Sequence, residues 1–92
     1  MNLKLSAEDV AITKRFFKAI DVLKDEKRIR GLQTFTRENG LNYWNMTTLK
    51  NEPDKRILKA GCLTYLVRDY GVSAHWLITG NGSMFDKNPH NT

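Results

Sequence analysis

The residue types that most often carry enzyme chemistry are few in this chain and stand far apart. His75 has no serine, cysteine or acid at a fixed spacing that would make it a general base. Cys62, the only cysteine, lies in the apolar stretch ILKAGCLTYLV, which predicts a buried small hydrophobic residue and rules out an intrachain disulfide. Because His75 and His90 are the only histidines, no spacing typical of zinc ligands exists. We therefore predict no enzyme, no metal site and no cofactor.

The stretch G-N-G at residues 80–82 is the one segment whose composition suggests a phosphate-binding loop. Such a loop requires a strand before it and a helix after it, and the surrounding sequence GVSAHWLITGNGSMF provides neither. We predict instead that Gly80 ends a helix and that a tight turn follows.

Positive charge is concentrated in the middle third of the chain. The net charge is +5, and residues 27–59 hold eight basic and three acidic side chains, so the excess belongs to this segment. The distribution favours a surface that faces a polyanion, although solvated helix faces with chance clustering remain an alternative. The eight basic residues are Lys27, Arg28, Arg30, Arg37, Lys50, Lys55, Arg56 and Lys59.

Length and composition predict one domain over residues 1–85, followed by a disordered polar tail over residues 86–92. The chain has 92 residues, of which 40% are apolar, enough for one modest core. It contains no run of about 18 apolar residues that could span a membrane. The first residues, MNLKLSAEDVAITKRFF, lack the apolar core of a signal peptide, so a cytoplasmic protein is expected.

Helical signals begin at Ser6, which can cap a helix running from residue 7 to 23 or a few residues beyond. Residues 32–39 then form a short helical pattern that Gly40 ends, and Asn42 can cap a further helix over residues 43–51. Two short helices joined by about three residues around a glycine form the helix-turn-helix pattern. The residues expected to face inward along these helices are Ile12, Phe16, Phe17, Ile20, Leu23, Ile29, Leu32, Phe35, Met46 and Leu49.

Two more helices are predicted near the C-terminus. Apolar residues from Ile57 to Tyr70 repeat at three and four, which predicts a fourth helix from Pro53 or Asp54 to Tyr70, closed by Gly71. Gly61 in its middle costs about 1 kcal/mol relative to alanine, which a close helix crossing would explain. The fifth helix follows Ser73, and its Trp76 and Leu77 are expected to bury against the first and fourth helices, with Met84 and Phe85 closing the core.

Two segments resemble one known family. The stretch LQTFTRENGLNYWNMTTLKN, residues 32–51, resembles the helix-turn-helix of lambda-repressor-like (XRE-type) DNA-binding domains, with Phe35, the turn Gly40-Leu41, and the inward residues Met46 and Leu49. The phrase YGVSAHWLITGNGSM resembles the segment Y-G-V-S-x-x-W-L-L-T-G-x-G-x-M that follows the fourth helix in phage CI-repressor-type domains. Together the two segments place the resemblance over roughly residues 10–85.

The resemblance implies an all-α, compact five-helix domain and a sequence-specific DNA-binding transcriptional regulator of the repressor type, bacterial or phage-derived. In this family the second helix of the pair lies in the major groove, which here is the helix around residues 43–51. Double-stranded DNA and a second copy of the chain are the expected partners, with no membrane and no small-molecule ligand. The implied DNA-binding residues are Gln33, Thr34, Arg37, Asn42, Tyr43, Trp44, Thr47, Thr48, Lys50 and Asn51.

The sequence departs from the family pattern at several of these positions. Leu32 stands where a polar residue usually contacts a phosphate, so Gln33 or Thr34 would have to take that role. Thr36 replaces a smaller residue, which could widen the angle between the two helices. Tyr43 and Trp44 are bulky, and their polar edges could meet bases or sugars. Alternatively, they form packing or a partner surface, and the protein is a helical interaction adaptor that has lost DNA readout.

Overall fold

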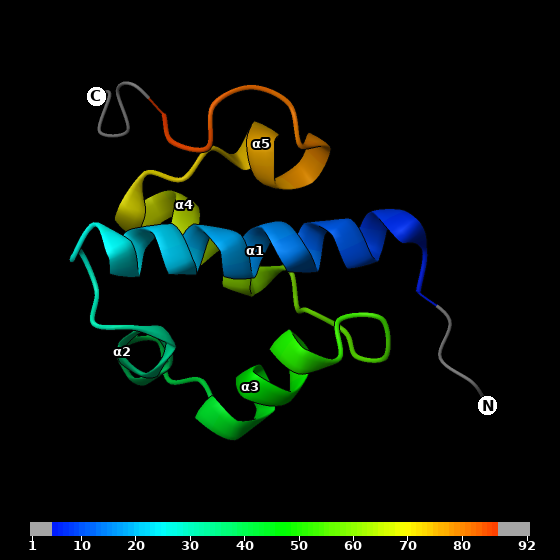
Figure 1. Cartoon of the computed structure of the whole chain (residues 1–92), viewed down its shortest axis with the longest axis horizontal. Helices are drawn as coiled ribbons and strands as arrows, with labels where there is room; N and C mark the ends of the chain where they lie inside the picture. The colour runs from blue at the N-terminus through cyan, green and yellow to red at the C-terminus, as the bar shows by residue number, and fades with distance from the viewer. Residues whose placement is uncertain (1–4, 87–92) are drawn as a thin grey trace. The chain divides into compact units, whose positions relative to one another are not determined.

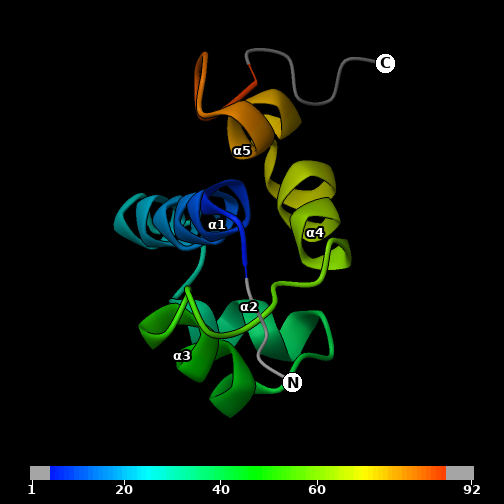
Figure 2. The same cartoon turned by 90° about the vertical axis from the view of Figure 1, so that its right-hand side faces the viewer.

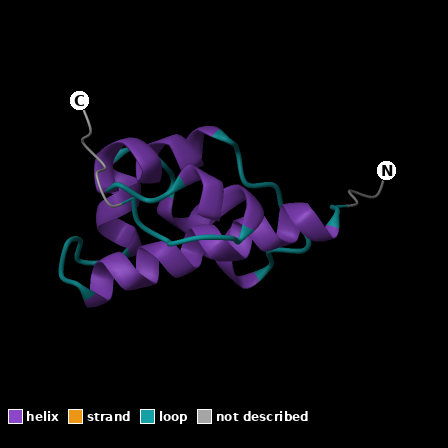
Figure 3. Cartoon of the chain, turned by 90° about the horizontal axis from the view of Figure 1, so that it is seen from above, coloured by secondary structure: helices purple, strands orange, loops and turns teal. Residues whose placement is uncertain are grey.

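A computed structural model describes residues 5–86, which form five α-helices. Figure 3 shows helices and loops and no strand in this part of the chain. The all-α prediction is confirmed for this range. The chain divides between Ile57 and Leu58 into two compact units, an N-terminal unit holding α1 to α3 and a C-terminal unit holding α4 and α5. The helices are α1 (Ala7–Asp25), α2 (Leu32–Glu38), α3 (Tyr43–Asn51), α4 (Gly61–Tyr70) and α5 (Ala74–Thr79) (Figure 1).

The start of α1 is held by a capping box, as the serine at residue 6 suggested. The Ser6 hydroxyl accepts a hydrogen bond from the Asp9 backbone N–H at 3.1 Å, and the Asp9 carboxylate accepts from the Ser6 backbone N–H at 3.2 Å. These two bonds pair backbone donors that would otherwise lack an intrahelical partner. The helix then runs for 19 residues, two longer than the shortest range predicted.

The interior of the N-terminal unit is built from aromatic and aliphatic side chains that all three helices contribute. Phe16 and Phe35 are fully buried and pack edge to face, with ring centroids 5.6 Å apart. Met46 and Leu49 of α3 are buried as predicted, and α3 contacts both α1 and α2. Figures 1 and 2 show α2 and α3 on the same side of α1. The longest helix therefore supports the shorter pair, which is too short to be stable alone.

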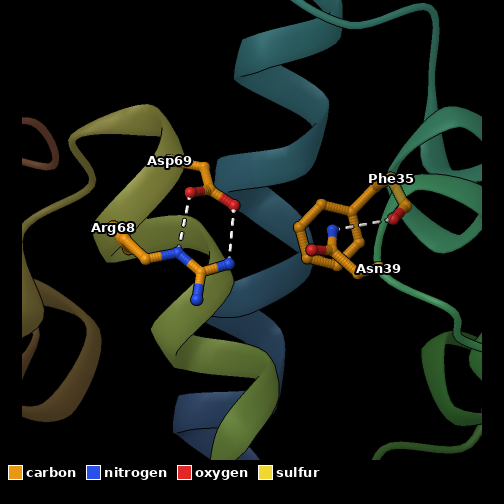
Figure 4. Close-up of polar contacts among 4 residues, drawn as sticks. All are labelled: Phe35, Asn39, Arg68 and Asp69. Atoms are coloured by element: carbon orange, nitrogen blue, oxygen red, sulfur yellow. Dashed lines mark hydrogen bonds and ion pairs between the residues drawn. The ribbon is translucent and has the colours of Figure 1, made fainter.

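The turn between α2 and α3 is fixed by backbone geometry and by one side chain. Gly40 has φ +65°, a left-handed conformation that glycine adopts without a side-chain clash. The backbone N–H of Leu41 donates to the Thr36 carbonyl at 2.8 Å. The Asn39 amide nitrogen donates to the Phe35 carbonyl at 2.9 Å (Figure 4). Thr36 itself is buried, with its hydroxyl bonded to the Gln33 carbonyl, so this position accommodates a threonine.

The predicted start of the fourth helix at residue 53 or 54 is wrong, because α4 begins only at Gly61. Residues 53–56 form a turn instead, in which the Lys55 backbone N–H donates to the Glu52 carbonyl. In a helix through this segment, the side chains of Lys55 and Lys59 would lie on the same face one turn apart, where like charges repel by roughly 0.2–0.5 kcal/mol. Ile57, which was predicted to belong to the apolar stripe of this helix, is 60% exposed.

The explanation offered for Gly61 is wrong as well. Gly61 is the first residue of α4 and is exposed, and a Cβ added to it would meet no atom within 4 Å. No close helix crossing therefore requires a glycine at this position.

The C-terminal unit follows the prediction more closely. Gly71, with φ +70°, ends α4, and the Ser73 hydroxyl accepts from the Trp76 backbone N–H at 3.1 Å to cap α5. Trp76 and Leu77 are buried, and α5 contacts α4. Beyond α5 the chain returns to the segment between the helices, where Val72 and Phe85 form an isolated antiparallel bridge. Met84 and Phe85 are half-buried, so they close this unit only in part.

Of the tail predicted over residues 86–92, only Asp86 is within the described range. Its backbone N–H donates to the Gly71 carbonyl at 2.9 Å.

Candidate nucleic-acid interface

The start of α3 is capped by a side chain within the segment expected to meet DNA. The Asn42 side-chain oxygen accepts from the Asn45 backbone N–H at 2.9 Å, as its position before the helix suggested. Asn42 is exposed, but its carbonyl oxygen is already engaged. Its amide NH₂ group is therefore the part of this side chain with capacity left to donate to a ligand.

One face of α3 points away from the interior of the N-terminal unit. With about 100° between successive residues, Trp44, Thr48 and Asn51 share the face opposite the buried pair Met46 and Leu49. The Trp44 side chain is 73% exposed, and Asn51 is also exposed. A large, exposed aromatic residue beside polar neighbours is thus presented to solvent at the N-terminal end of the helix.

Tyr43 and Trp44 are adjacent in the sequence, but their side chains are buried to different extents. Their rings contact each other edge to face, with centroids 5.3 Å apart. Tyr43 is half-buried and lies on the flank of α3 that also carries Lys50. Trp44 is the outward member of the pair. A ligand approaching the outer face of α3 would therefore meet Trp44 first, with the Tyr43 ring supporting its orientation.

The two threonines of α3 use their hydroxyl hydrogens within the helix. Thr47 donates to the Tyr43 carbonyl at 3.0 Å, and Thr48 donates to the Trp44 carbonyl at 2.9 Å. Each hydroxyl keeps acceptor capacity, and each side chain keeps its methyl group. These residues can therefore accept hydrogen bonds or contact an apolar group, such as a thymine methyl, without changing their present bonds.

Lys50 is engaged by α1. Its ammonium nitrogen lies 3.6 Å from an Asp21 carboxylate oxygen, and both side chains are about half exposed. An ion pair of this kind in solvent contributes little to stability. It does, however, hold a negative charge beside a cation that was expected to attract a phosphate.

The α2 residues of the candidate site border one shallow depression of about 320 Å³, entirely within the N-terminal unit. Gln33 and Arg37 are exposed and Thr34 is half-buried. Leu32, whose apolar character departs from the family pattern, borders the same depression. The complete lining is Lys24, Arg30, Gly31, Leu32, Gln33, Thr34, Arg37 and Tyr43.

Sequence reasoning missed three residues of this surface. Lys24 and Arg30 border the depression although neither was singled out individually as a candidate. Arg30 is one of the eight basic residues of the middle third, but its place beside the same depression as Lys24 depends on how the chain turns at Gly31. Asn45, on α3, is exposed beside Trp44. Its position three residues after the Asn42 cap, next to the inward Met46, is the signal that could have identified it.

The remaining candidates for chemistry lie in the C-terminal unit and are not grouped. Burial raises the pKa of the Cys62 thiol, and the charge of nearby Lys59 opposes this only in part. Arg68 and Asp69 form an exposed double hydrogen bond that lowers the pKa of the Asp69 carboxyl (Figure 4). Gly80, with φ +80°, ends α5 as predicted for the start of G-N-G. Within residues 5–86 no three His, Cys, Asp or Glu side chains are grouped to hold a metal ion.

Compared with known proteins, the chain matches no family model, and no curated protein or solved structure shows significant similarity to it. None of the described helices is long and apolar enough to cross a membrane.

Proposed function

We propose that this protein is a sequence-specific DNA-binding transcriptional regulator of the repressor type, with α2 and α3 as a helix-turn-helix and α3 in the major groove. The observation that carries the proposal is the outer face of α3, where Trp44 and Asn51 are exposed and Thr48 is half-buried, together with the exposed basic residues Arg37 and Lys50. An α-helix fits the width of the major groove, and polar side chains and methyl groups on its outer face can read base edges. The resemblance to lambda-repressor-like domains supports the same role for this pair of helices.

The two kinds of contact would come from different residues. Arg37 and Lys50 supply charge that attracts the phosphate backbone without regard to sequence. Thr47, Thr48 and Asn51 provide acceptors, methyl groups and an amide for base edges, and the ring of Trp44 provides an apolar contact. Because α3 has nine residues, one copy contacts few base pairs. We therefore expect two copies on a two-fold symmetric site.

The test is binding to DNA duplexes at several salt concentrations, measured by fluorescence anisotropy. We expect the affinity for a random duplex to fall steeply with salt, because each neutralised phosphate contributes about 0.9 to the log–log slope. The variant with Arg37→Ala and Lys50→Ala should bind more weakly with a smaller slope. The matched control, Lys14→Ala with Lys18→Ala, removes the same charge from exposed positions in the first half of α1.

Equal weakening by both double variants would show attraction by net charge alone and would contradict a specific interface. Selection of bound sites from a random DNA pool then tests sequence specificity. Recovery of a common two-fold symmetric sequence would support the repressor proposal, whereas no enrichment over many rounds would refute it.

A second candidate function is a helical adaptor for protein partners, which the 73% exposure of Trp44 specifically favours. Tryptophan is among the residues that most often dominate protein interfaces. If this reading holds, the protein does not bind duplex at low salt, and Trp44→Ala abolishes binding to the partner. Loss of DNA affinity on Trp44→Ala would instead assign the same ring to the DNA interface.

A further inference from the structure

The depression bordered by α1, α2 and the first residue of α3 is lined by basic side chains and by no acidic one. Three of its eight lining residues are basic, namely Lys24, Arg30 and Arg37, and none is acidic. They come from three places in the chain: the last turn of α1, the connection to α2, and α2 itself. Their positive charges are therefore brought together by the fold of the N-terminal unit.

These three basic side chains form no ion pair with any carboxylate of residues 5–86, where the ion pairs involve other basic residues, such as Lys50, Arg56 and Arg68. The place of Lys24 has a structural reason, because a cation is favourable near the C-terminal end of a helix. Arg37 lies in the last turn of α2 and is favoured there for the same reason, whereas no helix end accounts for Arg30. Cations gathered around one depression repel each other, and a bound anion would relieve that repulsion.

The backbone of one lining residue, Gly31, has a conformation that glycine alone adopts readily. Gly31 has φ +154° and ψ −170°. A Cβ built on it would lie 3.8 Å from the Lys24 side-chain Cδ, so the lysine stem lies close to this glycine. Lys24 therefore lies beside the residue that follows Arg30 in the chain. Gln33, Thr34 and Tyr43, which also line the depression, carry side-chain groups that can donate hydrogen bonds.

We propose that this depression binds a phosphate group. Guanidinium groups match the oxygen geometry of phosphate, and a lysine ammonium adds a point charge for a group carrying two or more negative charges. Uncharged donors on the same wall suit an oxyanion with several acceptor oxygens. The site goes beyond base reading by α3, because it can take either a phosphate of nucleic acid or a free phosphorylated compound. Since Arg37 and Tyr43 also belong to the proposed DNA interface, a free phosphorylated compound held here competes with DNA.

The test uses pyrophosphate as the probe, with the full chain followed by NMR chemical shifts and by calorimetry at low salt. We expect saturable binding of one pyrophosphate per chain, with shifts centred on residues 24–37. Arg30→Gln and Lys24→Gln should each weaken it at least about tenfold. The matched control is Lys14→Gln, which removes one charge about 15 Å further along the axis of α1. Thermal unfolding of each variant establishes that it remains folded.

A parallel duplex titration identifies the source of the phosphate. If pyrophosphate does not bind but Arg30→Gln lowers the salt slope for duplex by about 0.9 and Lys14→Gln does not, the site holds a phosphate of DNA. If pyrophosphate binds and displaces duplex, the site takes free phosphorylated compounds as well. The proposal is overturned if Arg30→Gln and Lys24→Gln match the Lys14→Gln control in both titrations. Duplex binding that still depends on Trp44 would then leave the proposed DNA function standing.

Discussion

Replacement of each of the two tryptophans by alanine should lower the stability of this protein to very different extents. Trp76, in α5, is 8% exposed, whereas Trp44, in α3, is 73% exposed. Replacing either by alanine removes the same atoms, so the difference in the free energy of unfolding reports mainly how much of each side chain is buried. A buried Trp covers about 150–250 Å². At about 25 cal/mol per Å² this corresponds to roughly 4–6 kcal/mol as an upper bound.

Because alanine retains part of this burial, we expect Trp76→Ala to lower the free energy of unfolding by about 3–5 kcal/mol. The total free energy of unfolding of a 92-residue protein is of order 5–14 kcal/mol, so this substitution would remove much of the stability. Trp44→Ala should cost about 1 kcal/mol or less, in proportion to the small buried fraction of its side chain. At 4–8 °C per kcal/mol, the midpoint of thermal unfolding should fall by at least about 12 °C for Trp76→Ala and only slightly for Trp44→Ala.

Thermal and urea unfolding followed by circular dichroism measure both variants under the same conditions. Each variant keeps one tryptophan, so its fluorescence gives an independent check on exposure. The emission of Trp44→Ala, from buried Trp76, should be blue-shifted relative to that of Trp76→Ala. Equal, small losses of stability for both variants would refute the burial argument. Trp44→Ala should instead weaken duplex binding, a property that a stability measurement does not detect.

The other predictions concern single interactions. Asn42→Ala should lower the free energy of unfolding by about 0.5–2 kcal/mol through loss of the α3 cap, while Asn42→Asp should keep most of it; equal losses in urea unfolding would contradict the cap. Gly61→Ala should raise the free energy of unfolding by about 0.4–1 kcal/mol, because its Cβ meets open space, and destabilisation would argue against that geometry. Asp21→Asn should tighten duplex binding several-fold in anisotropy titrations by releasing Lys50, and an unchanged affinity would show that the pair does not restrain it. Because burial raises its pKa, the Cys62 thiol should stay protonated and react slowly with iodoacetamide at pH 8 in the native protein; a rate equal to that in urea would contradict its burial.

Helix ends were predictable where a short-range interaction defines them. Ser6, Asn42 and Ser73 each accept a hydrogen bond from the backbone N–H three residues later, and such contacts depend on local sequence alone. The start of α4 had no such signal, since Ala60 provides no side-chain cap. There the apolar spacing from Ile57 onward was misleading, because spacing shows which residues could share a face but not whether anything covers that face.

In the candidate site, too, some features follow from local sequence and others depend on tertiary packing. The exposure of α3 opposite Met46 and Leu49 follows from helical periodicity, so the outward position of Trp44 could be anticipated. The sequence could not predict that Tyr43 is half-buried while Trp44 is exposed, because this difference depends on where α3 packs against its neighbours. The pairing of Lys50 with Asp21 joins residues far apart in the chain and likewise required the folded structure.

By itself the sequence determined that this chain is helical, where most of its helices begin and end, and that its excess positive charge belongs to the middle third. Those properties come from neighbours within a few positions, whose geometry is the same in any helix or turn. Only the tertiary structure decided that Lys24, Arg30 and Arg37 surround one depression without an acidic residue. Electrostatic interaction depends on distance in space, and the folding of α2 and α3 against α1 sets those distances.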